Sequence, residues 1–484
     1  MMPLDLGAVL TGTGGELRGT LPLDTRFPAI ERDSRRIEAG QLFIAIRGEQ
    51  FDGHRFVEDA AAKGAAAALV SQDWADRQSG ESIPLIVVDE PVAALQRLAA
   101  AWRDTLEVTV IGVTGSVGKS STKEVIASVL AEKFVTYRSP GNLNNEIGLP
   151  LSLLELNEQT EVAVLEMGGA YAAGELALLA SIAKPRIAVV TNVYPVHLER
   201  MGSIEAIAET KAELVAALPA DGIAVLNGDD ARVTAMASRT AGRVLTYGLD
   251  ESNDIRATKV ATEALEGTAF WLHVEAGESF YVKVPLVGGH AVELALAAIA
   301  VGHSLGMYIG EMLEGFKDPA IQIRLLVLPG PRGSRIIDDT YNASTPSVLS
   351  ALSLLGALKP RRAIAVLGDM RELGEVAEEE HRVIGRRAAE VANVVVTYGD
   401  LARLIGEEAQ TTSGVDGAPP AVTSFDLDQR EELVAFLLRE LQEGDVVLLK
   451  GSRGLRMEEM VFALRADIED DRGSLSDLGS TPRR

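Results

Sequence analysis

The stretch IGVTGSVGKSSTKE, residues 111–124, begins within an apolar segment at 108–113 and leads into a helical pattern. A glycine-rich turn between a strand and a helix is the layout of a phosphate-binding loop, where backbone N–H groups and the helix N-terminus face the anion. Lys119 is placed to reach the terminal phosphates, and the Ser120 hydroxyl is placed to ligate Mg²⁺. The alternative is a glycine-rich turn with a solvated lysine. The strand before the loop and the helix after it favour nucleotide binding, with ATP as the expected nucleotide.

The loop departs from the general phosphate-loop pattern at one position. Val113 stands five residues before Gly118, where the pattern has a glycine, and Gly115 lies inside the loop instead. The chain therefore carries a variant of the motif.

Composition bounds the class of protein. At 484 residues, and with roughly 150 residues per domain, about three domains are expected. The net charge of −24 argues against nucleic-acid binding, which needs a basic surface. The chain has 0 cysteines, which excludes disulfides, thiolate catalysis and zinc–thiolate sites.

No apolar run is long enough for a membrane span, and the N-terminal residues lack the pattern of a signal peptide. We therefore expect a cytoplasmic protein without membrane insertion. Residues 467–484 are polar and predict a disordered tail.

The order of apolar runs predicts an α/β protein of three domains. Residues 1–95 form a small N-terminal α/β domain, residues 96–315 a central parallel-sheet domain with the phosphate loop, and residues 316–466 a C-terminal Rossmann-like α/β domain. Residues 255–287 alternate in polarity and contain aromatics, which predicts antiparallel strands.

Ligands of open parallel sheets bind beyond the carboxyl ends of the strands, so polar residues at these ends are candidate site residues. Glu166 ends an apolar strand and is placed to hold Mg²⁺; a solvated glutamate at the strand end is the less favoured alternative. His197 follows another strand end, and a surface-loop histidine is the alternative. Lys211 lies on a helix among Glu205, Glu209 and Glu213. The residues alone favour a salt-bridged surface lysine at this position.

The third segment carries a second polar edge. Asp338 and Asp339 end a strand and are followed by Thr340, Tyr341 and Asn342, a combination that favours a site over a simple turn. Lys450, Ser452 and Arg453 follow another strand of the same segment.

The first segment offers weaker candidates. Ser34, Arg35, Gly48, Asp52 and His54 suit contacts with a diphosphate or a uracil, but turn chemistry explains the same residues.

These motifs together resemble the Mur ligase family over roughly residues 28–462. The resemblance rests on five segments: Asp33-Ser34-Arg35 with Asp52-Gly53-His54, the loop at 114–121, Gly141 to Pro150, Glu166-Met167-Gly168, and Ile337 to Ala343. It implies an ATP-dependent ligase that makes an amide bond through an acyl phosphate, with D-alanyl-D-alanine added to UDP-N-acetylmuramoyl-tripeptide by a monomer. Two alternatives remain: another Mur-type or folylpolyglutamate-type amino-acid ligase, and a phosphate-loop ATPase without amide chemistry.

The resemblance also implies roles for single residues. Ser120 and Glu166 resemble the ligands of one Mg²⁺, and His197 resembles a ligand of a second. Lys211 resembles a lysine that CO₂ converts to a carbamate, which helps to hold the second ion. The resemblance places Lys119, Asn145 and Asp339 in catalysis. The residues that it places around ATP are Thr114, Gly115, Ser116, Val117, Gly118, Ser121, Asn142, Tyr341 and Asn342. Contacts with the UDP-sugar are implied for Ser34, Arg35, Gly48, Asp52 and His54, and contacts with D-alanyl-D-alanine for Lys450, Ser452 and Arg453.

One segment departs from the family. The family usually carries Gly-x-His-Asn followed by a second Asn, whereas this chain has Ala291 and Leu294 at the two amide positions. Recognition of adenine is therefore expected to differ locally from that of the family or to be weaker.

Overall fold

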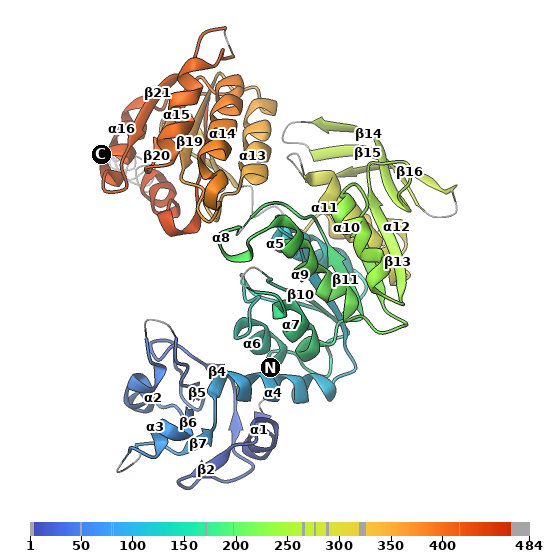
Figure 1. Cartoon of the computed structure of the whole chain (residues 1–484), viewed down its shortest axis with the longest axis vertical. Helices are drawn as coiled ribbons and strands as arrows, with labels where there is room; N and C mark the ends of the chain where they lie inside the picture. The colour runs from blue at the N-terminus through green and yellow to red at the C-terminus, as the bar shows by residue number, and fades with distance from the viewer. Residues whose placement is uncertain are drawn as a thin grey trace, which may run out of the picture.

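The computed structural model describes residues 4–48, 51–78, 80, 82–169, 172–196, 198–263, 267–274, 277–286, 290–318, 326–415 and 417–465. Three large sheets follow one another along the chain and along the long axis of the molecule (Figure 1). The N-terminal sheet lies at one end, the C-terminal sheet at the other, and the largest sheet lies between them.

The first sheet has the strand order β2-β7-β6-β5-β4. Its strands are β2 (Glu16–Arg18), β4 (Ile30–Glu31), β5 (Leu42–Ile44), β6 (Ala67–Ser71) and β7 (Leu85–Val88). All neighbours are parallel except β2 and β7. The other elements here are β1 (Leu4–Asp5), β3 (Arg26–Phe27), α1 (Leu6–Thr13), η1 (Gly53–Phe56), α2 (Val57–Ala62) and α3 (Gln72–Ala75).

The central sheet has nine strands in the order β16-β15-β14-β13-β12-β11-β8-β10-β9. Its parallel part consists of β8 (Thr109–Thr114), β9 (Thr136–Arg138), β10 (Val162–Glu166), β11 (Ile187–Val190), β12 (Ile223–Asn227) and β13 (Arg243–Gly248). The strand β8 pairs with β10 on one side and β11 on the other, and it is almost wholly buried. Its continuous apolar sequence fits a strand covered on both faces.

The sheet continues as β14 (Ile255–Glu263), β15 (Gly267–His273) and β16 (Ser279–Val284). The strand β14 pairs with β13 in parallel, and the next two pairs are antiparallel. The prediction of antiparallel strands at 255–287 is thus confirmed for the described residues, and these strands extend the parallel sheet.

Helices cover both faces of the central sheet. They are α4 (Pro91–Asp104), α5 (Lys119–Ala131), α6 (Gly148–Leu154), α7 (Glu175–Ala183), α8 (Leu198–Met201), α9 (Ile204–Ala216), α10 (Ala231–Ala235), α11 (Ala291–Ser304) and α12 (Ile309–Gly315). Buried residues of α5, α11 and α12 share one core, and those of α4, α6, α7 and α9 share another. The second core extends through Leu95 and Leu98 of α4 to Ile86 of the first sheet, so α4 packs against both domains.

The third sheet has the order β17-β18-β22-β19-β20-β21, parallel except for β17. Its strands are β17 (Leu326–Pro329), β18 (Arg335–Asp338), β19 (Arg362–Gly368), β20 (Val394–Tyr398), β21 (Ala421–Phe425) and β22 (Asp445–Lys450). Helices α13 (Thr345–Ala357), α14 (Ala377–Val391) and α15 (Ala402–Thr411) share a core on one face, and α16 (Arg430–Glu440) packs on the other.

The predicted fold class, three α/β domains with a central parallel sheet, is confirmed. The predicted boundary after residue 95 falls inside α4, and the one after residue 315 falls at the end of α12. Both boundaries stay predictions. The predicted tail at 467–484 lies outside the described residues. Within the described part of the chain, no helix has the length and apolar character needed to span a bilayer.

Candidate active site

Two glycines shape the loop between β8 and α5. Gly115 has φ +148°, and Gly118, which caps the N-terminus of α5, has φ +84°. Residues with a side chain rarely adopt such angles. A Cβ at Gly115 would lie 1.9 Å from Oγ1 of Thr191, so the loop passes directly against the end of β11. This path leaves the N-terminus of α5 open to a cavity that Gly118, Lys119 and Ser120 line, as anion binding requires.

Asn192, just after β11, holds the loop in place. Its carbonyl oxygen accepts from the Ser116 N–H at 2.9 Å, and its Oδ1 accepts from the Val117 N–H at 2.8 Å. Its Nδ2 donates to the Val117 carbonyl at 3.1 Å. Asn192 was not among the predicted site residues, although it follows a strand end as the predicted residues do.

Lys119 folds back over its own loop. Its Nζ donates to the carbonyls of Gly115 at 2.8 Å and Ser116 at 3.3 Å. Burial lowers the pKa of Lys119, while the carboxylates of Glu166 and Glu175 act in the opposite direction. The ammonium therefore lies where a phosphate oxygen can replace the loop carbonyls as its partner.

Glu166 ends β10 as a buried carboxylate with one unused oxygen. Its Oε1 accepts from Asn144 Nδ2 at 2.7 Å, whereas Oε2 is buried and has no hydrogen-bond partner. A buried carboxylate oxygen without a partner, in a cavity that the buried Ser120 also lines, suits a hard cation such as Mg²⁺. Asn144, which lies in the 141–150 segment but was not a predicted site residue, orients this carboxylate.

Lys211 is buried on α9, with 3% of its surface exposed. Burial, and then the positive charge of Lys119, lower its pKa to about 7, while Glu175 acts in the opposite direction. At neutral pH a large share of this amine is therefore neutral, which is the form that reacts as a nucleophile.

The interpretation of Lys211 as a salt-bridged surface residue is wrong. Glu209 pairs with Arg239, at 2.6 Å from Oε1, and the carboxylate of Glu213 accepts from the N–H groups of Gly174 and Ala177. The helical spacing suggested ion pairs between Lys211 and the glutamates of α9. This spacing does not reveal which face of α9 is packed against the sheet.

The polar residues predicted at the strand ends of the third domain contact one another across two segments of the chain. Lys450, at the end of β22, is buried and lies 2.7 Å from Oδ2 of Asp339, and its Nζ also donates to the Asn342 carbonyl at 2.8 Å. The guanidinium of Arg453 lies over the ring of Tyr341, 5.6 Å from its centroid. The Ser452 hydroxyl accepts from the Arg371 N–H at 2.8 Å.

A cavity of about 950 Å³ joins the second and third domains. The predicted residues that line it are Gly115, Ser116, Val117, Gly118, Lys119, Ser120, Ser121, Asn142, Asn145, Glu166, Lys211, Asp339, Tyr341, Asn342, Lys450, Ser452 and Arg453. Thr114 lies beneath the loop, where its hydroxyl donates to the Gly168 carbonyl at 3.1 Å. The Oδ1 of Asn145 accepts from the Gly148 N–H at 2.9 Å, at the start of α6. His197 lies outside the described residues, so its role stays a prediction.

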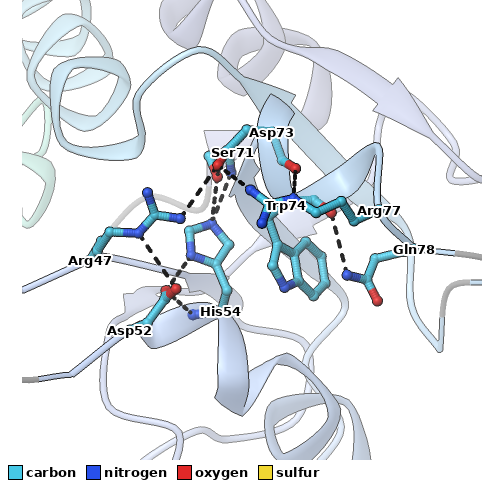
Figure 2. A network of polar contacts seen from close by, with 8 residues as sticks. All are labelled: Arg47, Asp52, His54, Ser71, Asp73, Trp74, Arg77 and Gln78. Carbon is cyan, nitrogen blue, oxygen red and sulfur yellow. Dashed lines mark hydrogen bonds and ion pairs between the residues drawn. The ribbon is translucent and has the colours of Figure 1, made fainter.

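The predicted residues of the first domain do not line this cavity. Figure 2 shows a polar network around His54, which is buried. Its Nε2 accepts from the Ser71 N–H at 3.0 Å, so Nδ1 carries the proton and donates to Asp52 at 2.6 Å. Both ring nitrogens are thus used within the domain, and His54 orients Asp52.

Arg47, which sequence analysis did not select, brings a cation to this network. It lies 3.5 Å from both Asp52 and Asp73, and its side chain is 56% exposed. Arg35 pairs with Asp33 and is exposed, the Ser34 carbonyl accepts from Lys63 at 2.9 Å, and the Gly48 N–H donates to the Phe51 carbonyl at 2.8 Å. These residues stay predicted substrate contacts.

Three family profiles match the chain: Mur ligase family, catalytic domain, at residues 27–103; Mur ligase middle domain at 113–302; and Mur ligase, glutamate ligase domain, at 323–453. The UDP-N-acetylmuramoyl-tripeptide–D-alanyl-D-alanine ligase of Bacillus subtilis is 37% identical over 89% of this chain and 92% of its own length. The protein of the same name in Escherichia coli is 34% identical, over 96% of this chain and 99% of its own length.

Solved structures of Mur ligases also align with this chain. A crystal structure of MurF from Acinetobacter baumannii aligns with a TM-score of 0.82 and 29% identity, covering 96% of this chain and 98% of its own. MurF ligase from Thermotoga maritima, solved in complex with ADP, aligns with a TM-score of 0.74 and 30% identity, covering 92% of this chain and 98% of its own.

Gly115→Ala is expected to abolish tight nucleotide binding, because the new Cβ would collide with Thr191 and the φ angle disfavours any side chain. Equilibrium binding of ADP with Mg²⁺ measures the loss. Gly310→Ala is the matched control, because a Cβ there meets nothing within 4 Å. Equal ADP affinity in both variants would contradict the tight approach of the loop to β11.

Lys211→Met is expected to stabilise the ligand-free protein in CO₂-free buffer at pH 6.5, and less so at pH 9.5. With a pKa of about 7 when folded and near 10.5 when unfolded, this lysine makes stability rise with pH between those values. The midpoint of thermal unfolding at the two pH values measures the effect. The control is Lys317→Met, since Lys317 is exposed. A gain for Lys211→Met that does not depend on pH would disprove the lowered pKa.

Proposed function

The chain belongs to the Mur ligase family, and we propose that it joins D-alanyl-D-alanine to UDP-N-acetylmuramoyl-tripeptide at the expense of ATP. The observation that carries the proposal is that a phosphate loop, a buried lysine and a carboxylate with one unpaired oxygen line one cavity. The names of the relatives supply the substrates. The product belongs to peptidoglycan precursor synthesis, and a cytoplasmic location and a monomeric state are part of the proposal.

The reaction has two steps. A carboxylate oxygen of the tripeptide attacks the γ-phosphorus of ATP, and the bond to the β,γ-bridging oxygen breaks, which yields an acyl phosphate and ADP. The dipeptide amine then attacks the acyl carbon, loses a proton and expels inorganic phosphate. In the first step two anions approach each other, so the site must supply positive charge.

The second domain supplies this charge. Backbone N–H groups at the start of α5 and the ammonium of Lys119 hold the phosphates. Ser120 and Glu166 would hold one Mg²⁺, which neutralises phosphate charge when bound; the unpaired Oε2 of Glu166 fits this role.

We propose that Lys211 is carbamylated. A neutral amine adds to CO₂ and loses a proton, and the product is a carboxylate in place of a cation. The lowered pKa of Lys211 makes the amine available, and the nearby Lys119 stabilises the negative product. The carbamate, together with His197, would hold a second Mg²⁺.

The third domain would bring in the dipeptide. Lys450 holds Asp339 and the Asn342 carbonyl, so the segment 339–342 keeps one shape at the cavity edge. We propose that Asp339, Tyr341 and Asn342 close over ATP, and that Ser452 and Arg453 contact D-alanyl-D-alanine. The UDP end of the other substrate is assigned to the first domain, at Ser34, Arg35, Gly48 and the network of Arg47, Asp52 and His54.

Release of phosphate from ATP is expected to require both peptide substrates. The assay uses purified protein with ATP and Mg²⁺ and omits UDP-N-acetylmuramoyl-tripeptide or D-alanyl-D-alanine in turn. Each omission should reduce steady-state release to the background rate. Release that is indifferent to both substrates would instead identify a phosphate-loop ATPase, and activity with single amino acids would identify another Mur-type or folylpolyglutamate-type ligase.

Lys211→Ala is expected to lower turnover by about 10²–10³-fold, because an anion that helps to hold the metal is lost. Added formate or acetate should restore part of the activity by occupying the space of the carbamate. ¹³C NMR with ¹³CO₂ provides a second readout, since wild type should show a carbamate signal that the variant lacks. Normal turnover of the variant, or a wild-type spectrum without this signal, would contradict carbamylation.

A further inference from the structure

A second lysine of α5 is buried and is not used by the proposed reaction. Lys123 lies one turn after Lys119, and its side chain is wholly buried. Its Nζ donates to the carbonyl of Ser139 at 2.5 Å and to the carbonyl of Gly141 at 3.1 Å. Its third partner is Oε1 of Glu124, at 3.0 Å. An ammonium group has three protons to donate, so these partners leave Lys123 none for a phosphate.

Both carbonyls belong to the segment 139–147, which connects β9 to α6 and is neither helix nor strand. The segment is exposed at Pro140 and Gly141, and the backbone turns at Gly141 with φ +54°. A charged donor that bonds two carbonyls two residues apart fixes the path of the chain through this turn. Because a buried ammonium without partners is costly, the contact favours this one position of the segment. Lys123 thus anchors the segment to the helix that follows the phosphate loop.

The anchored segment in turn holds Glu166. The Oγ of Ser139 accepts from the Glu166 N–H at 3.1 Å, and the Nδ2 of Asn144 donates to Oε1 of Glu166 at 2.7 Å. The Asn144 carbonyl accepts from the Gly168 N–H at 2.7 Å, which ties the same residue to the chain after β10. The backbone and one carboxylate oxygen of Glu166 are therefore fixed by the segment that Lys123 anchors. The other oxygen, Oε2, is the one left without a partner.

We propose that Lys123 is a positioning residue for the Mg²⁺ site. The two expected ligands come from different elements, since Ser120 lies on α5 and Glu166 ends β10. The segment 139–147 forms a polar connection between them, and Lys123 is its attachment to α5. Without the ammonium, Asn144 and Glu166 would be free to exchange hydrogen bonds, and Oε2 would no longer be the oxygen kept for the metal. This inference rests on the proposed use of ATP with Mg²⁺.

The test is calorimetric binding of an ATP analogue with an imido group between its β and γ phosphorus atoms. Wild type and Lys123→Met are titrated with Mg²⁺ at a fixed nucleotide concentration, and the affinity for the analogue is also measured in EDTA. The half-saturating Mg²⁺ concentration should rise about tenfold in the variant, as when a partner of a metal ligand is lost. The affinity in EDTA should stay close to that of wild type, because Lys119 and the N–H groups of the loop are retained.

Lys133→Met is the matched control. Lys133 also donates to a backbone carbonyl, that of Gly306 at 2.7 Å, but it lies beyond the other end of α5. Its Mg²⁺ requirement should equal that of wild type. If Lys123→Met does not fold, Lys123→Gln, which keeps a donor at the site, takes its place and should raise the Mg²⁺ requirement in the same direction. A lower midpoint of thermal unfolding with an unchanged Mg²⁺ requirement would mean a role in stability alone and would overturn the proposal.

Asn144→Ala tests the route by which Lys123 acts. Alone, it should raise the Mg²⁺ requirement at least as much as Lys123→Met, because it removes the bond to Glu166. In the double variant the two effects should overlap, whereas effects that multiply would overturn this route. No peptide substrate is present, so a failure of the ligase reaction leaves the result unaffected. A wild type that binds the analogue equally with and without Mg²⁺ would overturn both the metal site and the role of Lys123.

Discussion

Two neighbouring lysines, Lys211 buried and Lys119 half-buried, make the candidate site unfavourable without an anion. They are held close enough for the charge of Lys119 to lower the pKa of Lys211. Removing two ammonium groups from water in one region is costly unless negative groups pair with them. Phosphates at the loop and a carbamate at Lys211 would each supply negative charge, so binding and modification would stabilise the same region that catalysis uses. The buried position of Lys211 on α9 is thus a constraint on folding and on function.

Residues at the carboxyl ends of strands were the part of the site that sequence could predict. Glu166 and Asp339 follow directly from apolar runs, because parallel strands end at one edge of a sheet. Asn192 meets the same criterion, but its role depends on the close approach of two loops, which no local pattern encodes. Lys211 was interpreted wrongly from the residues because a helix with charges on several faces does not reveal which face is buried. The resemblance to a family, not the pattern, predicted its role.

The strands of the fold could also be predicted only in part. Buried central strands such as β10 consist of continuous apolar residues, and the prediction that Glu166 ends such a strand is confirmed. Edge strands such as β9 and β21 are partly exposed and were missed, since alternating or polar sequence of this length also fits loops. That β14 joins β13 in parallel depends on contacts between segments rather than on either sequence.

The phosphate loop admits few substitutions because the backbone itself is the ligand. A Cβ at Gly115 would collide with Thr191, and Asn192 accepts from the N–H groups of Ser116 and Val117. A substitution that shifted this backbone would also move the start of α5, whose N–H groups are the expected partners of the phosphates. A contact made through a side chain can pass to another side chain, whereas a contact made through the backbone depends on the path of the whole loop.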